Sequence, residues 1–266
     1  MLRVLSLGGG VQSSTLALMM ARGALPLPDC AIFADTGAEP KSVYEWLMWL
    51  EQQLPFPVHR VSKGNLREHL LDASNGKRYA GIPLHTESAG PRRAGMLKRQ
   101  CTSEFKVEPI TRKLRELVNL RPRQRGPDST LIVQYIGISV DEIIRMKPSR
   151  HRWIAHRWPL IDLGMTRGHC LEWLKRHDYP LPGKSACTFC PYRDNRSWRD
   201  MKANDESSWR DAVRIDEAVR NGVRGTRERL YVHRSLKPLV TIDFRQAEDF
   251  GQIDLFGNEC EGLCGV

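Results

Sequence analysis

Apolar and polar positions along the first half of the chain follow two periods, one typical of buried strands and one typical of helices with a single apolar face. Short apolar runs predict four strands, at residues 2–7, 30–34, 58–61 and 131–138. Helical spacing predicts four helices between or after them, at residues 15–22, 41–53, 66–71 and 105–120. The last strand is continuously apolar, as a buried parallel strand should be. The alternation predicts an α/β fold, a parallel sheet covered by helices.

The second half of the chain has a weaker pattern. It predicts one helix, then a polar pair of helices, then an edge strand, at residues 165–177, 195–219 and 236–244. Residues 74–100 have no clear period and read as a long loop, which is typical of lids and binding segments. The simplest partition is an α/β domain over residues 1–195, followed by a mainly helical extension over residues 196–266.

Composition and charge narrow the class of protein. The chain has 266 residues, 41% hydrophobic and 27% charged, which is ordinary for a globular protein. No apolar run approaches the ~20 residues that span a bilayer, and no secretory signal is evident, so we expect a cytoplasmic protein with no membrane partner. The net charge is +10, and basic residues crowd residues 92–125 and 145–157. These stretches are either solvated surface or a groove for a polyanion.

Seven cysteines in a cytoplasmic chain do not predict a disulfide framework. Cys30 and Cys170 lie in an apolar strand and an amphipathic helix, where buried thiols are common. The other five lie beside loop signals: Cys101, Cys187, Cys190, Cys260 and Cys264. The Cys-x-x-Cys spacing at 187 and 190 brings two sulfurs to one metal and suits an iron–sulfur cluster or zinc. Unligated loop thiols are the alternative.

The first predicted strand runs directly into a glycine-rich loop, Gly8-Gly9-Gly10-Val11-Gln12-Ser13-Ser14. Glycines let the backbone approach a ligand, and the helix start behind them presents free N–H groups to an anion. The hydroxyls of Ser13 and Ser14 can cap the helix or bind phosphate oxygens. No Gly-Lys-Ser/Thr follows, so the loop is not a Walker motif. It is either a phosphate cradle of another type or a tight turn without a ligand.

Further polar groups follow two other strands and should lie at the same edge of the sheet. Asp35-Thr36-Gly37 follows the second strand, where the carboxylate could hold a ribose hydroxyl, Mg²⁺ or an adenine amine. An ordinary turn is the alternative, because Asp and Gly are frequent there. After the strand at 131–138 come the charged residues Asp141, Glu142 and Arg145.

Taken in order, these segments resemble the phosphoadenosine-phosphosulfate reductase family of PP-loop proteins, in the adenine nucleotide alpha-hydrolase superfamily. Gly9, Gly10 and Ser13 match the family's SGGxxS loop, while Gly8 stands in place of its first serine. The other matching segments, over residues 1–195, are Asp35-Thr36-Gly37 and those at 99–109, 137–145, 158–162 and 182–191. Ser139 stands where the family has arginine.

The resemblance implies a Rossmann-like parallel sheet flanked by helices that binds ATP, or phosphoadenosine phosphosulfate, with Mg²⁺. The implied reaction is at the α-phosphate. The implied nucleotide-binding residues are Ser6, Gly8, Gly9, Gly10, Gln12, Ser13, Ser14, Asp35, Thr36, Gly37, Gly137, Asp141 and Glu142. The implied catalytic residues are Ser13, Asp35, Arg145 and Cys264.

The resemblance also implies a 4Fe–4S cluster on Cys101, Cys187 and Cys190, with zinc as the alternative metal. Thr102 replaces the second cysteine of the family's first pair. The fourth ligand is then Cys264 or Cys260, or the fourth iron stays open. The tail around Cys264 alternatively supplies a nucleophilic cysteine, as in family reductases that are reduced by thioredoxin.

Three functions remain open at this point. The first is a PP-loop ATP pyrophosphatase or adenylyltransferase, dependent on iron and sulfur, that activates or thiolates a substrate such as tRNA or DNA with a sulfur donor. The second is a phosphoadenosine- or adenosine-phosphosulfate reductase of sulfate assimilation. The third is a non-catalytic homologue that binds nucleotide or nucleic acid. The sequence leaves the oligomeric state open.

Overall fold

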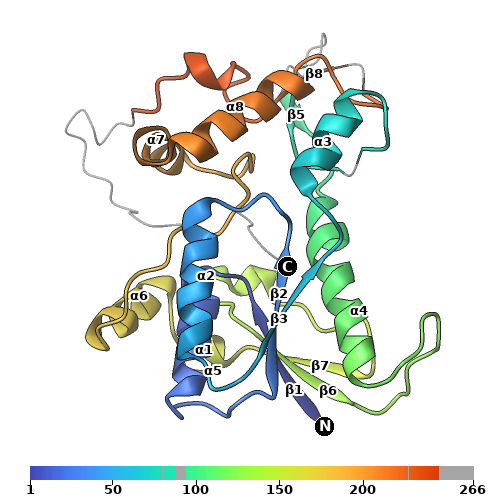
Figure 1. Ribbon diagram of the computed structural model, residues 1–266, viewed down its shortest axis with the longest axis vertical. Coiled ribbons are helices and arrows are strands. Elements are labelled where there is room, and N and C mark those ends of the chain that lie inside the picture. Colours follow the sequence, from blue (N-terminus) through green and yellow to red (C-terminus); the bar gives the residue numbers. More distant parts are fainter. Residues whose placement is uncertain (80, 88–93, 227, 246–266) are drawn as a thin grey trace.

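The structure is a computed structural model, and it describes residues 1–79, 81–87, 94–226 and 228–245 (Figure 1). Its centre is a five-stranded parallel sheet in the order β3-β2-β1-β6-β7. The bounds of these strands are β1 Leu2–Leu7, β2 Cys30–Asp35, β3 Val58–Ser62, β6 Ile132–Ile136 and β7 Ile154–Arg157. The parallel sheet flanked by helices that the sequence predicts is therefore confirmed.

The order of the strands creates a crevice at one place in the sheet. The chain steps from β1 outward to β2 and β3, then returns to pair β6 with the other side of β1. Val4 of β1 accordingly lies between Cys30 of β2 and Gln134 of β6. In open α/β sheets, ligands bind outside the carboxyl ends of the strands at such a reversal. Here the reversal lies between β1 and β6.

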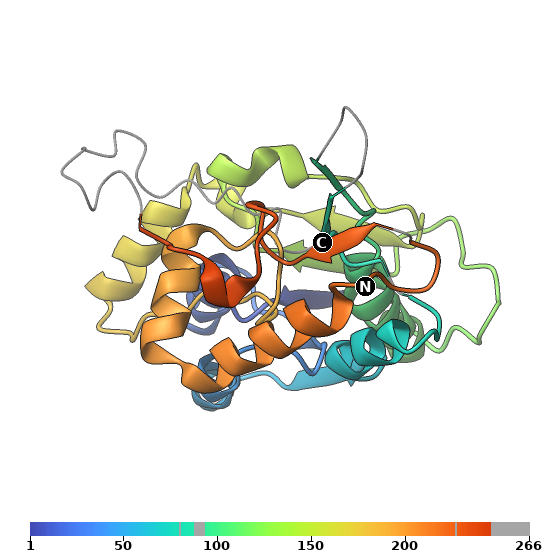
Figure 2. The same cartoon turned by 90° about the horizontal axis from the view of Figure 1, so that it is seen from above.

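Helices cover both faces of the sheet (Figure 2). Four of them share a core with β1 and β2 on one face: α1 Val11–Ala21, α2 Lys41–Gln53, α5 Pro159–Asp162 and α6 Arg167–Arg176. On the other face, α4 Glu108–Leu117 packs through Leu114 on Val4, Ile32 and Ile132. A π-helical turn, η1 Ser103–Val107, precedes α4, so the single helix predicted over 105–120 is divided and ends earlier.

A second layer of elements lies beyond the carboxyl edge of the sheet and forms the upper part of Figure 1. It contains α3 Leu66–Ser74, α7 Asn195–Asn204, α8 Glu206–Val219 and an antiparallel sheet of β4 His85–Glu87, β5 Ala94–Met96 and β8 Arg229–Tyr231. Its core joins Leu70 of α3 to Trp198 of α7, Ile215 of α8 and Phe189 of the cysteine turn. The boundary near residue 195 stays a prediction.

Two predictions about this second layer are wrong. Residues 236–244 form no edge strand, because Pro238 precedes a short 3₁₀ helix, η3 Leu239–Thr241, whose first amide donates to buried Asp216 at 3.0 Å. Residues 74–100 are not all loop, since they contain β4 and β5. None of the described helices has the length and apolar character needed to cross a bilayer.

Candidate nucleotide and thiol site

The glycine loop turns sharply between β1 and the start of α1. Gly9 has a φ of +72°, a conformation that favours glycine. The Ser13 hydroxyl accepts from the amide of Gly8 at 3.1 Å and donates to the carbonyl of Gly10 at 3.3 Å. Gly10 is the N-cap of α1, and no side chain caps the helix. The first amides of α1 are thus presented to an anion at the carboxyl edge.

Two of the predicted loop hydroxyls have structural contacts. Ser14 is fully buried and accepts from the indole N–H of Trp46 at 2.8 Å. Ser6 lies within β1, where its hydroxyl accepts from the amide of Gln134 on β6 at 2.6 Å. The Ser14 contact joins the start of α1 to α2, and the Ser6 contact joins β1 to β6. A nucleotide contact for either residue stays a prediction.

Gly137 closes the base of the crevice between β1 and β6. A Cβ atom added there would lie 2.8 Å from the backbone N and Cα of Ser13, closer than real Cβ atoms approach. Nearby, the side-chain amide of Gln12 donates to the hydroxyl of Ser139 at 3.4 Å across the crevice. The end of β6 and the start of α1 are therefore in direct backbone contact.

Asp35-Thr36-Gly37 forms a tight turn at the end of β2. One carboxylate oxygen of Asp35 accepts from the amide of Gly37 and from the hydroxyl of Tyr44, both at 2.8 Å. Burial and the adjacent Asp35 raise the pKa of Tyr44 well above its usual range, so Tyr44 stays a donor. Gly37 has a φ of +66°. Asp35 thus holds the turn, and its predicted roles toward ribose or Mg²⁺ and in catalysis stay predictions.

The charged residues predicted after β6 contact one another and the start of α6. Arg145 forms an ion pair with Glu142 at 2.5 Å, and both side chains are nearly buried. Burial raises the pKa of Glu142, although Arg145 opposes the shift. Asp141 accepts from the amide of Arg167, the first residue of α6, at 3.1 Å. These residues lie at the carboxyl edge as predicted, and their part in nucleotide binding or catalysis stays a prediction.

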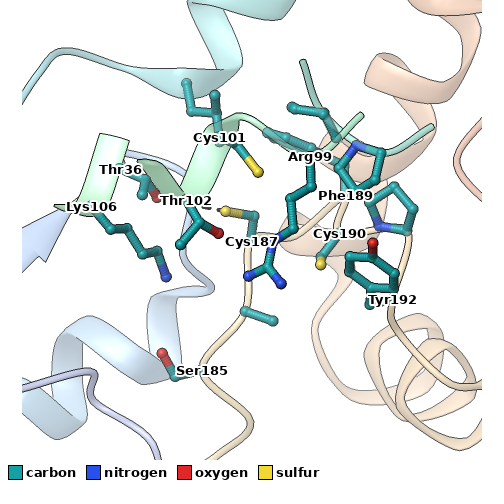
Figure 3. A pocket seen from close by; sticks show the side chains of 15 residues that line it. Thr36, Arg99, Cys101, Thr102, Lys106, Ser185, Cys187, Phe189, Cys190 and Tyr192 are labelled. Atoms are coloured by element: carbon teal, nitrogen blue, oxygen red, sulfur yellow. Dashed lines mark hydrogen bonds between the residues drawn. The ribbon is translucent and has the colours of Figure 1, made fainter. Parts of the chain in front are cut away.

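Three of the predicted metal ligands open onto one small cavity, which we call the thiol pocket. Its volume is about 50 Å³. Its lining includes the thiols of Cys101, Cys187 and Cys190 and the polar side chains of Thr36, Arg99, Lys106 and Ser185. Figure 3 shows the sulfurs of Cys101 and Cys187 turned toward one another, with the Arg99 side chain extending between them and Cys190. Residues far apart in the sequence thus meet at one place.

The thiol pocket fits a thiolate-bound metal in the kind of donor it offers, since Fe–S clusters and structural zinc are held by cysteine sulfur. As placed, no three His, Cys, Asp or Glu side chains of the described residues are grouped closely enough to hold a metal ion. Burial, followed by the charge of Glu39, raises the pKa of Cys187 to about 12, which favours a protonated thiol in the metal-free chain. Cys260 and Cys264 lie outside the described residues.

The Cys-x-x-Cys turn is attached directly to the glycine loop and to the turn after β2. The Ser185 hydroxyl donates to the carbonyl of Gly8 at 2.5 Å. The amide of Thr188 donates to the carbonyl of Ala38 at 2.8 Å, and Thr36 Oγ1 lies 3.7 Å from the sulfur of Cys187. The predicted phosphate cradle and the thiol pocket therefore form one continuous site.

Glu39 is a site residue that sequence reasoning missed. It is 4% exposed, its carboxylate accepts from Lys106 at 3.2 Å, and a carboxylate oxygen lies 3.4 Å from the Ser185 hydroxyl oxygen. It thereby joins the pocket, the glycine loop and η1. Its position two residues after the Asp35-Thr36-Gly37 turn was the available signal, because residues just beyond a strand end face the ligand edge.

Comparisons with known proteins give a limited result. No family model matches the chain, and no curated protein matches it. Among solved structures, it is similar to a phosphoadenylyl-sulfate reductase from Candida auris in a phosphate complex, with a TM-score of 0.44 and 14% identity. The structural relation is distant. The similarity covers 68% of this chain and 74% of that one.

Proposed function

We propose that this chain is an adenine-nucleotide enzyme that activates a substrate at the α-phosphate of ATP and uses the thiol pocket for sulfur chemistry on that substrate. One observation carries the proposal: Ser185, two residues before Cys187, donates to the carbonyl of Gly8. This bond joins a thiol-lined cavity to a helix N-terminus suited to phosphate. The crevice at the strand reversal, where such folds bind ligands, supports the same assignment.

The activation step balances as a substitution at phosphorus. A nucleophilic oxygen of the substrate bonds to the α-phosphorus, the bond from that phosphorus to the bridging oxygen breaks, and pyrophosphate leaves with the electron pair. Amides of the glycine loop and of the first turn of α1 would hold the phosphate oxygens and stabilise the charge that develops. Mg²⁺ brought with the nucleotide would offset the charge of the leaving pyrophosphate. Ser13 would keep the loop in shape through its two backbone bonds.

The thiol pocket supplies the second half of the proposal. Cys101, Cys187 and Cys190 would hold a 4Fe–4S cluster, with Cys264 as the fourth ligand, and such a cluster can carry sulfide or electrons. Arg99 and Lys106 place positive charge beside the sulfurs, which would partly offset the burial and the Glu39 charge that raise the pKa of Cys187. Thr36 would position Cys187 relative to the nucleotide turn.

The test is pyrophosphate release from ATP by anaerobically purified protein, assayed with bulk tRNA, with DNA and without polynucleotide. We expect release, and we expect Ser13→Ala to lower kcat/KM about tenfold, because one hydrogen bond to a functional loop is worth about 1 kcal/mol or more. Ser207→Ala, an exposed serine on α8 whose hydroxyl donates to Asp205 at 3.0 Å, serves as the matched control and should retain activity.

Two outcomes would contradict the proposal. Sulfite formation from phosphoadenosine phosphosulfate with thioredoxin, without pyrophosphate release from ATP, would assign the chain as a reductase. Tight ATP binding with no turnover in iron-replete protein would assign it as a non-catalytic binder. Iron and zinc analysis of the same samples decides the metal: roughly four irons per chain supports the cluster, and one zinc contradicts it.

A further inference from the structure

Six cations from the two basic stretches lie in the two loops that lead to the amino edge of the sheet, away from the thiol pocket. Residues 118–131 connect α4 to β6 at this edge, and residues 146–153 run back from η2 (Val140–Arg145) alongside β7 to reach the same edge at the start of β7. Together they carry six cations and one carboxylate: Arg121, Arg123, Arg125, Lys147, Arg150, Arg152 and Asp128. All six cations are exposed. We call these two loops the arginine loops.

Specific contacts hold the two arginine loops against each other. The indole of Trp153 lies against Gly126, where an added Cβ would be 2.2 Å from the ring. The Arg115 guanidinium stacks over the same indole at 5.9 Å and donates to the carbonyls of Arg121 and Gln124 at 2.5 and 2.6 Å. The amide of Leu131 donates to the carbonyl of Trp153 at 2.9 Å. The first loop, which projects from the body beside α4 in Figures 1 and 2, is thus fixed to the second.

The charge of this surface is mostly uncompensated by the protein itself. Within the described residues, the ion pair of Arg152 with Asp128, at 3.1 Å, is the one that ties an arginine-loop cation to a carboxylate, and both side chains are largely exposed. Arginine is the side chain that best matches phosphate, because its planar fork donates two parallel hydrogen bonds. A surface of five exposed arginines therefore favours a phosphate-rich polymer.

A membrane surface fits less well than a polynucleotide. Proteins that bind anionic bilayers at their surface bury large apolar side chains beside their basic residues. Both arginine loops are fully described, and within them Met146 is the one large apolar side chain that is exposed. The exposed Ile143 and Ile144 that precede it belong to η2, which follows β6 at the carboxyl edge of the sheet. The cations here stand among prolines and small polar residues instead.

The path from the arginine loops to the site is short. It follows β7, the edge strand, which has four residues and spans roughly 13 Å. Lys147 lies beside the middle of this strand, where its carbonyl is 2.9 Å from Nδ1 of His156, and exposed Arg157 ends the strand at the carboxyl edge. One helical turn of duplex DNA is about 34 Å long, so the length of β7 is less than half a turn. A polynucleotide held at the arginine loops could therefore reach the crevice.

We propose that the arginine loops are a docking surface that holds a nucleic acid by its phosphates, without reading its sequence, and leads it along β7 toward the crevice. That the bound polymer is the substrate rests on the proposed function, whereas the binding itself does not. Phosphate contacts of this kind position a polynucleotide and carry no base specificity.

The test measures binding of a fluorescent 20-base-pair DNA duplex and a 20-nucleotide single strand against salt concentration, without ATP. Each phosphate contact contributes about 0.9 to the slope of log K against log salt on duplex DNA. The triple variant Arg121→Gln, Arg123→Gln, Arg125→Gln should therefore reduce the slope by about 2.7. The matched control is Arg22→Gln, Arg176→Gln, Arg214→Gln, exposed arginines on other helices, which lowers the net charge of +10 by the same three units. It should retain the wild-type slope.

Three results would overturn the inference: no binding of either polynucleotide at low salt, equal losses in both triple variants, or binding to phosphatidylserine vesicles in place of polynucleotide. Circular dichroism melts of both variants establish that they are folded. ATP binding, measured on the same samples by equilibrium dialysis, separates this inference from the proposed function. If the chain binds ATP but no polynucleotide, only the docking surface is contradicted. If it binds polynucleotide but releases no pyrophosphate, only the proposed function is contradicted.

Discussion

Gly137 is the residue at which the fold and the proposed nucleotide site constrain each other most tightly. Its missing side chain lets the end of β6 touch the backbone of Ser13, which in turn holds the amide of Gly8. A methyl group there has no flexible neighbour to displace, because the atoms it would meet are backbone. The close approach of two main chains is the physical reason for glycine at this position.

Gly137→Ala should therefore push the first turn of α1 away from β6. We expect a loss of about 1–3 kcal/mol in the free energy of unfolding, typical of overpacking, and ATP binding at least tenfold weaker. Urea denaturation and equilibrium dialysis with ATP measure the two effects. Gly168→Ala is the matched control, since it lies within α6 and an added Cβ there meets its nearest atom at 3.5 Å. That change should leave ATP binding intact and stabilise the chain by up to about 1 kcal/mol. Equal ATP binding by both variants would contradict this role of Gly137.

At the scale of elements, helix α8 holds the two turns that shape the site. Asp211 of α8 forms an ion pair with Arg67 of α3 and accepts from the hydroxyl of Thr188 at 2.5 Å. Arg67 also donates to the carbonyl of Gly37 at 3.1 Å. One carboxylate thus connects the cysteine turn to the nucleotide turn through α3, so the helical extension takes part in building the site.

Asp211→Asn should loosen both turns at once. The carboxylate is mostly buried, so we expect a loss of about 1–3 kcal/mol in unfolding free energy. We also expect faster amide exchange at Thr188 and Leu66, whose amides donate to the carbonyls of Ala38 and Thr36. Hydrogen exchange read by mass spectrometry checks this. Glu206→Gln, which removes a largely exposed ion pair on the same helix, should cost at most about 0.5 kcal/mol. Matching effects of the two variants would contradict a bridging role for Asp211.

Elements with a strong local signal were predictable from the sequence. The apolar face of α2 and the polar segment 195–219 gave predictions that agree with the observed helices, Lys41–Gln53, Asn195–Asn204 and Glu206–Val219. Strands β4, β5 and β8 were not predicted, because each has only three residues and β4 pairs with β8 across more than a hundred residues of sequence. The alternation of apolar and polar residues that predicts a strand cannot be recognised over three residues.

The candidate site divides in the same way. Its glycine loop and cysteine turn are contiguous motifs that the sequence analysis identified, although only the glycine loop was expected at the ligand edge. Glu39 and Arg67 act through partners on distant elements, Lys106 and Asp211. Nothing local marks Arg67, and the one local signal for Glu39 is its place just beyond a strand end. The Leu236–Phe244 stretch misled for a related reason: its apolar residues pack into the second-layer core without pairing as a strand, because the amide of Leu239 bonds to Asp216.

For the molecule as a whole, the second layer is the part most sensitive to acid. His233 is 4% exposed; its Nε2 lies 3.0 Å from the side-chain oxygen of Asn195 on α7, and its Nδ1 lies 2.9 Å from the Ser235 hydroxyl. Burial lowers the pKa of His233 to about 4, with further contributions from Arg234 and His85. Burial also lowers the pKa of His85. Both histidines belong to the segments that bring β8 and β4 together.

Stability should therefore fall as the pH drops from 6.5, the ordinary histidine value, to about 4. Over this window the unfolded chain binds a proton that His233 in the folded chain does not, so acidification stabilises the unfolded state relative to the folded state, by about 3 kcal/mol at most. Above pH 6.5 the contribution of His233 is fully present. Urea denaturation between pH 7.5 and 4.5 should show this slope, and His233→Gln should flatten it while lowering stability at pH 7.5. A slope as steep in the variant as in the wild type would assign the acid sensitivity to other groups, because glutamine cannot take up the proton.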